Sequence, residues 1–213
     1  MNKHSIDFKL YLITDRKLFT TVDLLYAGVE DALKAGVKAV QLREKDLPTR
    51  DLLALSYRFR ELTTRYGAML FINDRLDIAM SVNADGVHLG QSSIPVYAVR
   101  NVVGRKLKIG FSAHNLEEAL TAEKEGADFI TFGPLYQTPS KLKYGNPVGL
   151  ESLKKVKGSI YLPIFGIGGI KLNNAVDVMQ AGASGIALIS GILGAADIRK
   201  AAGEYLKIAG EKI

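Results

Sequence analysis

The stretch Ala35-Gly36-Val37-Lys38-Ala39-Val40 recurs in related form along the chain. Similar junctions read Asn-Ala-Asp-Gly-Val at 83–87, Glu-Gly-Ala-Asp-Phe-Ile at 125–130 and Ala-Gly-Ala-Ser-Gly-Ile at 181–186. In each, a helical stretch ends, a small residue turns the chain, and an apolar strand begins. These junctions precede every second predicted strand, so they indicate a chain built from repeated strand–helix units.

The rest of the chain continues this alternation. Apolar runs of strand length are predicted at 10–14, 39–43, 69–73, 86–89, 108–112, 129–132, 164–167 and 185–189. Helical periodicity predicts helices at 23–35, 49–66, 76–82, 96–102, 116–125, 150–156, 173–181 and 195–209. Eight such units without a linker predict one α/β domain over residues 1–213, a single (β/α)8 TIM barrel. An open doubly wound sheet is the structural alternative; closure is favoured because it leaves no strand edges.

Composition narrows the function classes. The chain of 213 residues is 47% hydrophobic and 23% charged, which is typical of a globular protein. It has no apolar run long enough to span a membrane, no apolar core near Met1 for a secretory signal, and no cysteine, so we expect a cytoplasmic protein. The net charge of +6 is spread out without a basic block, which favours small phosphorylated ligands over nucleic acid. The oligomeric state is left open, a homo-oligomer included.

Polar residues gather where the predicted strands end, which is where such barrels carry their active sites. These positions hold cations, hydroxyls, amides and one acid, and glycine-rich turns follow strands seven and eight. Cations and hydroxyls suit phosphate oxygens, and turns at those two strands commonly bind phosphate through backbone N–H groups. The turn Gly166-Ile167-Gly168-Gly169 does not continue as a dinucleotide fingerprint, so nucleotide binding is not predicted.

Several of these residues also fit simpler roles. Arg43 and Lys45 could form surface salt bridges with Glu44 or Asp46, and Asp74 could cap the helix that follows it. His88 alternates with apolar residues and is interpreted as a residue of the barrel interior. His114 precedes an acidic first helical turn and could take part in capping. The stretch 136–147 is long for a strand-to-helix loop, and such loops often act as lids.

The chain resembles the family of thiamine phosphate synthase and the related thiazole tautomerase. Matching segments are Tyr11-Leu-Ile-Thr-Asp-Arg16, Gln41-Leu-Arg-Glu-Lys45, Ile72-Asn-Asp74, Ala84-Asp-Gly-Val-His-Leu-Gly-Gln91, Gly110-Phe-Ser-Ala-His114, Gly133-Pro-Leu-Tyr-Gln-Thr-Pro-Ser-Lys141, Gly166-Ile-Gly-Gly-Ile170 and Ile189-Ser190. The match covers nearly the whole chain in order. It implies a (β/α)8 barrel, in agreement with the strand count.

The resemblance also implies the roles of single residues. Contacts to a hydroxymethylpyrimidine diphosphate are implied for Gln41, Arg43, Lys45, Asn73, Ser112 and Lys141. Contacts to a thiazole phosphate are implied for Thr138, Ser140, Gly169, Ile189 and Ser190. Asp74 matches a ligand of Mg²⁺, the expected cofactor. The family carries a second metal-binding Asp where this chain has Ser93, which predicts weaker metal binding or a changed substrate.

Three functions follow as hypotheses. A synthase would join the two substrates and release diphosphate, with Mg²⁺, Arg43, Lys45 and Lys141 neutralising the leaving group. A tautomerase would need no metal and would use His114 as general acid and base. A non-catalytic binder of a phosphorylated ligand is the third, because fold alone does not specify chemistry. The cation set favours the synthase, while Ser93 fits the tautomerase.

Overall fold

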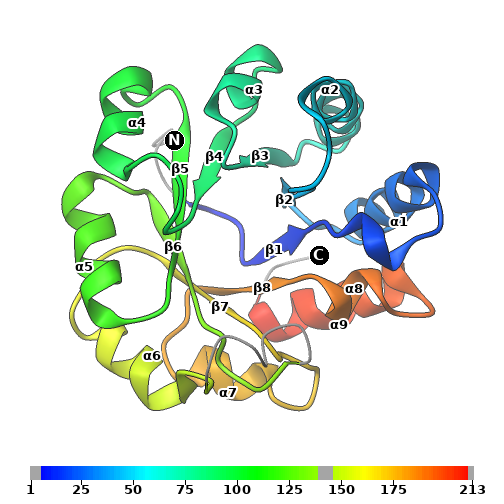
Figure 1. Ribbon diagram of the computed structural model, residues 1–213. Coiled ribbons are helices and arrows are strands. Elements are labelled where there is room, and N and C mark those ends of the chain that lie inside the picture. The colour runs from blue at the N-terminus through cyan, green and yellow to red at the C-terminus, as the bar shows by residue number, and fades with distance from the viewer. Residues whose placement is uncertain (1–5, 139–145, 211–213) are drawn as a thin grey trace.

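The chain closes into a parallel barrel in which each strand pairs with the next and β8 pairs with β1 (Figure 1). This computed structural model describes residues 6–138 and 146–210. The strands are β1 (Leu10–Ile13), β2 (Ala39–Leu42), β3 (Met69–Asn73), β4 (Gly86–Leu89), β5 (Lys108–Ala113), β6 (Phe129–Phe132), β7 (Ile164–Ile167) and β8 (Gly185–Leu188). The predicted (β/α)8 barrel is confirmed, and the open doubly wound alternative is wrong.

Helices surround the barrel (Figure 1). They are η1 (Arg16–Leu18), α1 (Val22–Lys34), α2 (Thr49–Arg65), α3 (Leu76–Ser81), α4 (Val96–Val103), α5 (Leu116–Glu125), α6 (Gly149–Lys157), α7 (Ala175–Gln180), α8 (Ser190–Leu193) and α9 (Ile198–Ala209). Each of the longer helices turns an apolar stripe inward, so a continuous hydrophobic layer lies between the helices and the strands. No helix in the described part of the chain is long and apolar enough to cross a membrane.

The predicted helix at 195–209 begins later than expected, and a separate short helix precedes it. Gly194 ends α8, and Asp197 caps α9 by accepting the N–H of Lys200 at 2.9 Å. The prediction places no helix between the strand at 185–189 and the helix at 195–209, so α8 is a correction to it, and Asp197 marks where α9 begins. The helix α8 begins directly after β8, on the rim that carries the site.

Aromatic side chains fill the barrel interior. Phe8, Tyr11, Phe71, Phe129 and Phe165 are each at most 2% exposed, and their ring centroids lie 4.9–6.1 Å apart where they contact one another. Tilted and edge-to-face ring packing makes the interior a solid core.

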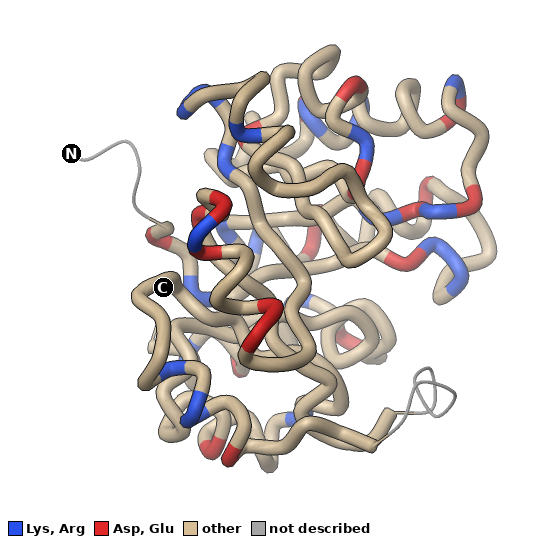
Figure 2. The backbone as a smooth tube through the Cα atoms, turned by 60° about the vertical axis from the view of Figure 1, so that its left-hand side comes forward, with Lys and Arg blue, Asp and Glu red and all other residues tan. Residues whose placement is uncertain are grey.

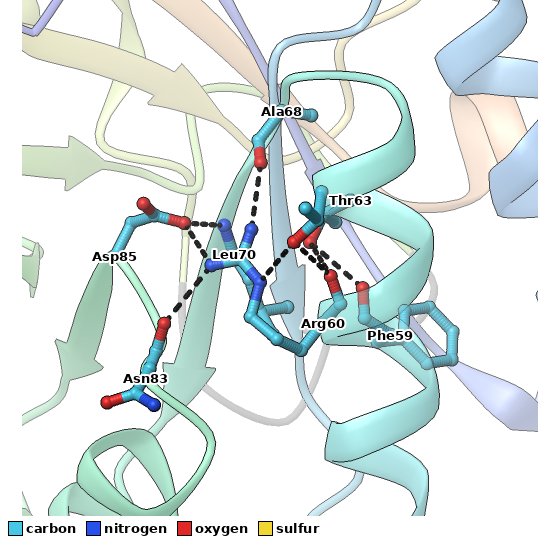
Figure 3. A network of polar contacts seen from close by, with 8 residues as sticks. Phe59, Arg60, Thr63, Ala68, Leu70, Asn83 and Asp85 are labelled. Carbon is cyan, nitrogen blue, oxygen red and sulfur yellow. Dashed lines mark hydrogen bonds and ion pairs between the residues drawn. The ribbon is translucent and has the colours of Figure 1, made fainter.

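The repeated junctions of the sequence fasten the rim at which the strands begin. Asp85, just before β4, accepts the backbone N–H of Leu70 at 2.8 Å and pairs with Arg60 at 2.6 Å (Figure 3). Arg60 also donates to the carbonyl oxygens of Ala68 and Asn83. One ion pair on α2 therefore joins the starts of two neighbouring strands.

Two other side chains that precede a strand accept a backbone N–H of the neighbouring strand in the same way. Asp128, before β6, accepts the N–H of Ile109 at 2.6 Å and pairs with Arg100 at 2.5 Å. Ser184, before β8, accepts the N–H of Ile164 at 3.2 Å. The repeat thus supplies an acceptor for the first buried amides of β3, β5 and β7, which would otherwise be unpaired.

Candidate active site

A buried carboxylate organises the opposite rim, where β1 and β2 end. Glu44 is 4% exposed and accepts the hydroxyl of Thr14 at 2.6 Å and the backbone N–H of Arg16 at 3.0 Å. The same Thr14 oxygen accepts the N–H of Arg43 at 2.9 Å. Burial raises the pKa of Glu44, while the Thr14 and Arg16 hydrogen bonds oppose that rise. Glu44 therefore ties the two loops together and fixes the backbone at Arg43.

Two cations of this rim have no acidic partner among residues 6–138 and 146–210. Asp46 pairs with Arg16 at 2.9 Å and with Lys17 at 3.3 Å, and Glu44 faces Arg16 as well. Within the described residues, Arg43 and Lys45 form no ion pair, so the simpler interpretation as local salt bridges is wrong. Arg43 is half-buried, and Lys45 is exposed. Both charges remain available for an anion.

Asp74 follows β3 in a left-handed conformation. Its φ of 66° is one that aspartate tolerates better than most residues, and its N–H donates to the carbonyl of His88 at 2.8 Å. The capping interpretation is wrong, because Arg75 occupies the N-cap of α3 and no side chain caps that helix. Asn73, the last residue of β3, lies half-buried beside it. Strained residues of this kind are common at functional sites.

Asp74 and Ser93 lie on one open cavity of about 590 Å³ between the β3 and β4 loops. Its lining residues are Asp74, Arg75, Leu76, Asp77, Met80, Ser92, Ser93 and Ile94. Asp77 is held by Arg75, with a contact of 2.9 Å. The Ser93 hydroxyl accepts the N–H of Gly90 at 2.8 Å and so closes the turn after β4. Within the described residues, no group of three or more acids and histidines lies close enough to hold a metal.

A polar network crosses the barrel interior below this rim. Gln41 donates to the Tyr11 hydroxyl at 3.1 Å, and that hydroxyl lies 3.4 Å from Nδ1 of His88. Nε2 of His88 lies 3.0 Å from the Ser112 hydroxyl and 3.4 Å from that of Thr131. Burial, with a smaller effect of the Arg43 charge, lowers the pKa of His88 to about 3. His88 is thus a neutral residue of the interior, as predicted.

His114 does take part in capping. Glu118 accepts the His114 backbone N–H at 2.7 Å and lies 3.2 Å from its Nδ1, while Asn115 caps α5 through the N–H of Glu118. The side chain of His114 is 39% exposed. Glu118 thus contacts both the backbone and the ring of His114 at the start of α5.

The loops after β6 and β7 are joined through their backbones. The N–H of Leu135 donates to Ile167 at 2.9 Å, and that of Tyr136 donates to Gly168 at 3.0 Å. Gly169 has a φ of +67°, and a Cβ there would lie only 2.7 Å from that of Tyr136, so only glycine fits this contact. Gly168 and Gly169 are thus required for the close contact between the β6 and β7 loops.

The remaining predicted residues follow β6 and β8 in the sequence. Thr138 is half-buried near the end of the described part of this loop, and Ser140 and Lys141 lie outside the described residues. Ile189 is the N-cap residue of α8, and Ser190 is its exposed first residue.

Three interior or loop residues escaped the sequence interpretation. Tyr11 and Thr131 are buried polar members of the interior network, and Thr14 holds Glu44. A signal was present, because each is a polar side chain in or directly after an apolar strand run, where burial demands a hydrogen-bond partner. The partner's identity depends on which strands become neighbours.

A family model and curated relatives of this chain carry the same description. A family model described as thiamine monophosphate synthase matches residues 10–192. The thiamine-phosphate synthase of Clostridium acetobutylicum is 46% identical over 195 residues, which is 92% of this chain and 92% of that protein. That of Pyrococcus furiosus is 42% identical over 203 residues, or 95% of each chain.

A solved structure agrees with these relatives. The thiamine phosphate pyrophosphorylase from Pyrococcus furiosus superposes with a TM-score of 0.86 at 41% sequence identity. The match covers 98% of this chain and 96% of that one. The similarity therefore extends over the whole barrel and includes the rim described above.

Proposed function

This chain belongs to the thiamine monophosphate synthase family, and we propose that its barrel couples hydroxymethylpyrimidine diphosphate with hydroxyethylthiazole phosphate. The products are thiamine phosphate and diphosphate. The C–O bond to diphosphate breaks, and the thiazole nitrogen forms a bond to the pyrimidine methylene carbon. Both substrates are small phosphorylated molecules, as the positive net charge favours.

The observation that carries the proposal is a pair of cations after β2 that pair with no acid in the described part of the chain. Arg16 and Lys17 occupy Glu44 and Asp46, so Arg43 and Lys45 keep their charges for the ligand. A departing diphosphate gains negative charge, and preorganised cations stabilise such charge without reorganising. Burial of Glu44 is therefore useful to the site: it removes a carboxylate that would compete with the diphosphate.

We assign the other contacts by the family pattern. The pyrimidine diphosphate is held by Gln41, Arg43, Lys45, Asn73, Ser112 and Lys141. The thiazole phosphate is held by Thr138, Ser140, Gly169, Ile189 and Ser190. In support, Gly169 and Ser190 follow β7 and β8, the usual place for a phosphate in such barrels.

The oxygen donors near Asp74 fit a magnesium ion. Asp74 and Ser93 line one cavity, and Asp77 beside them is engaged by Arg75. Mg²⁺ commonly takes one or two carboxylates and completes its shell with phosphate oxygens and water. We propose that Asp74 holds the ion, which would supply Lewis-acid neutralisation of the diphosphate. Ser93 would contribute a neutral oxygen at most.

No protein nucleophile or strong base is needed for this reaction. The ionised pyrimidine methylene is itself the electrophile, and the thiazole nitrogen carries the electron pair. The contribution of the chain is to hold the two rings in line and to stabilise the leaving group. His114, whose backbone and ring both contact Glu118, has no step in this scheme.

The test is to incubate the purified protein with both substrates and Mg²⁺ and to measure thiamine phosphate. Arg43→Met should lower kcat/KM about 10- to 100-fold, since a charge-assisted contact is worth about 1.5–3 kcal/mol. Arg65→Met is the matched control, because Arg65 is the last residue of α2, far from the strand ends that carry the site, and pairs with Glu30. Absence of product, or equal rates in the two variants, would contradict the proposal.

A further inference from the structure

We propose that Tyr11 and His88 form a directional hydrogen-bond relay that presents Gln41 to the substrate ring as an acceptor and Ser112 as a donor. His88 is then a positioning residue, since it acts on the ligand through Ser112. The inference rests on the proposed function, because it concerns how that same site recognises the pyrimidine half.

The relay begins at the carboxamide of Gln41. Its Nε2 donates to the Tyr11 hydroxyl at 3.1 Å. A phenol has one proton, so an oxygen that accepts from Gln41 is free to donate onward. The next polar atom is Nδ1 of His88, 3.4 Å away. Tyr11 therefore donates to His88, and Nδ1 is an acceptor.

This direction fixes the other side of the imidazole. A neutral imidazole carries one proton, so Nε2 must hold it when Nδ1 accepts. Nε2 lies 3.0 Å from the Ser112 hydroxyl oxygen, which also accepts from Thr131 at 3.3 Å. With two donors already directed at its oxygen, Ser112 has its own proton free for a third partner.

Burial keeps both relay residues in the required charge states. Tyr11 and His88 are 0% and 3% exposed. Burial raises the pKa of Tyr11 well above its ordinary value and lowers that of His88 to about 3. Neither side chain can form its ion in this interior without losing hydration, so both are neutral in the relay.

The two ends of the relay define the ring edge that fits. Gln41 uses its nitrogen within the barrel, and its Oε1 takes part in no hydrogen bond with a described residue. Gln41 is 1% exposed, and among the described side chains the one buried polar atom without a partner belongs to Arg16, so Oε1 of Gln41 is not an orphaned buried acceptor. An acceptor at Gln41 and a donor at Ser112 complement an amino group next to a ring nitrogen, the edge of an aminopyrimidine.

The opposite direction is the alternative that an experiment can exclude. If Tyr11 donated to Gln41, His88 would carry its proton on Nδ1 and accept from Ser112 through Nε2. The site would then offer the reverse pair of groups. The tautomer of His88 therefore reports the direction of the whole relay.

The first experiment measures that tautomer without any substrate. Uniformly 15N-histidine-labelled protein is examined by long-range 1H–15N correlation between about pH 5 and pH 8. The His88→Gln variant assigns the His88 signals. A neutral ring with its proton on Nε2 at every pH supports the relay. A proton on Nδ1, or titration of His88 within this range, overturns it.

The second experiment separates positioning from simple support of the fold. His88→Gln can keep a donor near the Nε2 position, whereas His88→Phe cannot. We expect His88→Phe to raise KM for the pyrimidine diphosphate about 30-fold with kcat within about threefold, because the lost contact is made in ground and transition state alike. KM for the thiazole phosphate should stay within about twofold, and His88→Gln should restore most of the loss.

Phe165→Leu is the matched control, since Phe165 lies in the same interior cluster and contacts Tyr11. It should lower stability and leave both KM values unchanged. Equal effects of Gln and Phe at position 88, a change in both KM values, or no change at all would contradict the relay. If His88→Phe does not fold, the tautomer measurement and His88→Gln still decide. Wild-type turnover is measured separately, so a failed relay is distinguished from a failed assignment of the reaction.

Discussion

Removal of the Asp85 carboxylate should weaken the barrel at the end opposite the site. Asp85 accepts the N–H of Leu70 at 2.8 Å and the guanidinium of Arg60 at 2.6 Å. Asp85→Ala leaves the Leu70 amide, at the start of a buried strand, without its acceptor, which costs about 1–3 kcal/mol. The ion pair adds about 0–1 kcal/mol, because the Asp85 side chain is 38% exposed. We therefore expect a loss of about 1–4 kcal/mol in the free energy of unfolding.

Urea unfolding followed by circular dichroism measures this loss. Ser184→Ala is the matched control, because Ser184 performs the same task for Ile164 with a neutral hydroxyl at 3.2 Å. That variant should lose about 1 kcal/mol. Asp85→Ala should keep kcat for coupling within about twofold, because its effect lies at the far rim. A smaller loss for Asp85→Ala than for Ser184→Ala, or a tenfold fall in kcat with the fold intact, would refute the reasoning.

Four further outcomes follow. Folding lowers the pKa of His88 from 6.5 to about 3, so the unfolded state binds more protons below about pH 7. Lowering the pH from about 7 to about 5 should therefore reduce the free energy of unfolding by about 2 kcal/mol in the wild type. The His88→Gln variant should not show this loss in acid unfolding. Ser93→Asp should lower the Mg²⁺ concentration for half-maximal coupling and Asp74→Ala should raise it; a rate independent of Mg²⁺ in all three proteins would contradict the metal assignment. Lys141→Ala should slow coupling about 10- to 100-fold, and near-normal turnover would remove its role. His114→Ala should keep normal coupling at saturating substrates, which a fall in kcat would contradict.

The sequence predicted the barrel well because both of its signals are local. The junctions at 35–40, 83–87, 125–130 and 181–186 mark where strands begin. The predicted strand bounds agree with the observed ones to within one residue at every end. The helix α8 was missed because its four residues are too few to show helical periodicity. The start of α9 was placed three residues early, although Asp197 is a typical N-cap residue.

The site was predictable only in outline. Placement of polar residues after each strand follows from the parallel topology, and Asp74 and Ser93, which follow β3 and β4, line one cavity. The partners of a side chain depend on register and on loop geometry, which no local pattern encodes. Glu44 illustrates the limit: its sequence neighbours Arg43 and Lys45 were the obvious partners, yet Arg16 and Thr14 reach it from the preceding strand's loop.

Phe8 fills the end of the barrel at which the strands begin. Its ring lies 4.9 Å from that of Phe165 and 5.7 Å from that of Phe129, so the N-terminal end is plugged by aromatic carbon. We therefore expect ligands to reach the site from the opposite rim, where the strands end. Under the proposed arrangement, both substrates and both products pass through that one opening. A pyrimidine ring bound at Gln41 and Ser112 is then covered by the ligand that binds second. The deeper ligand can then leave only after the shallower one. The aromatic cluster around Phe8 would thus impose an order on ligand binding and release.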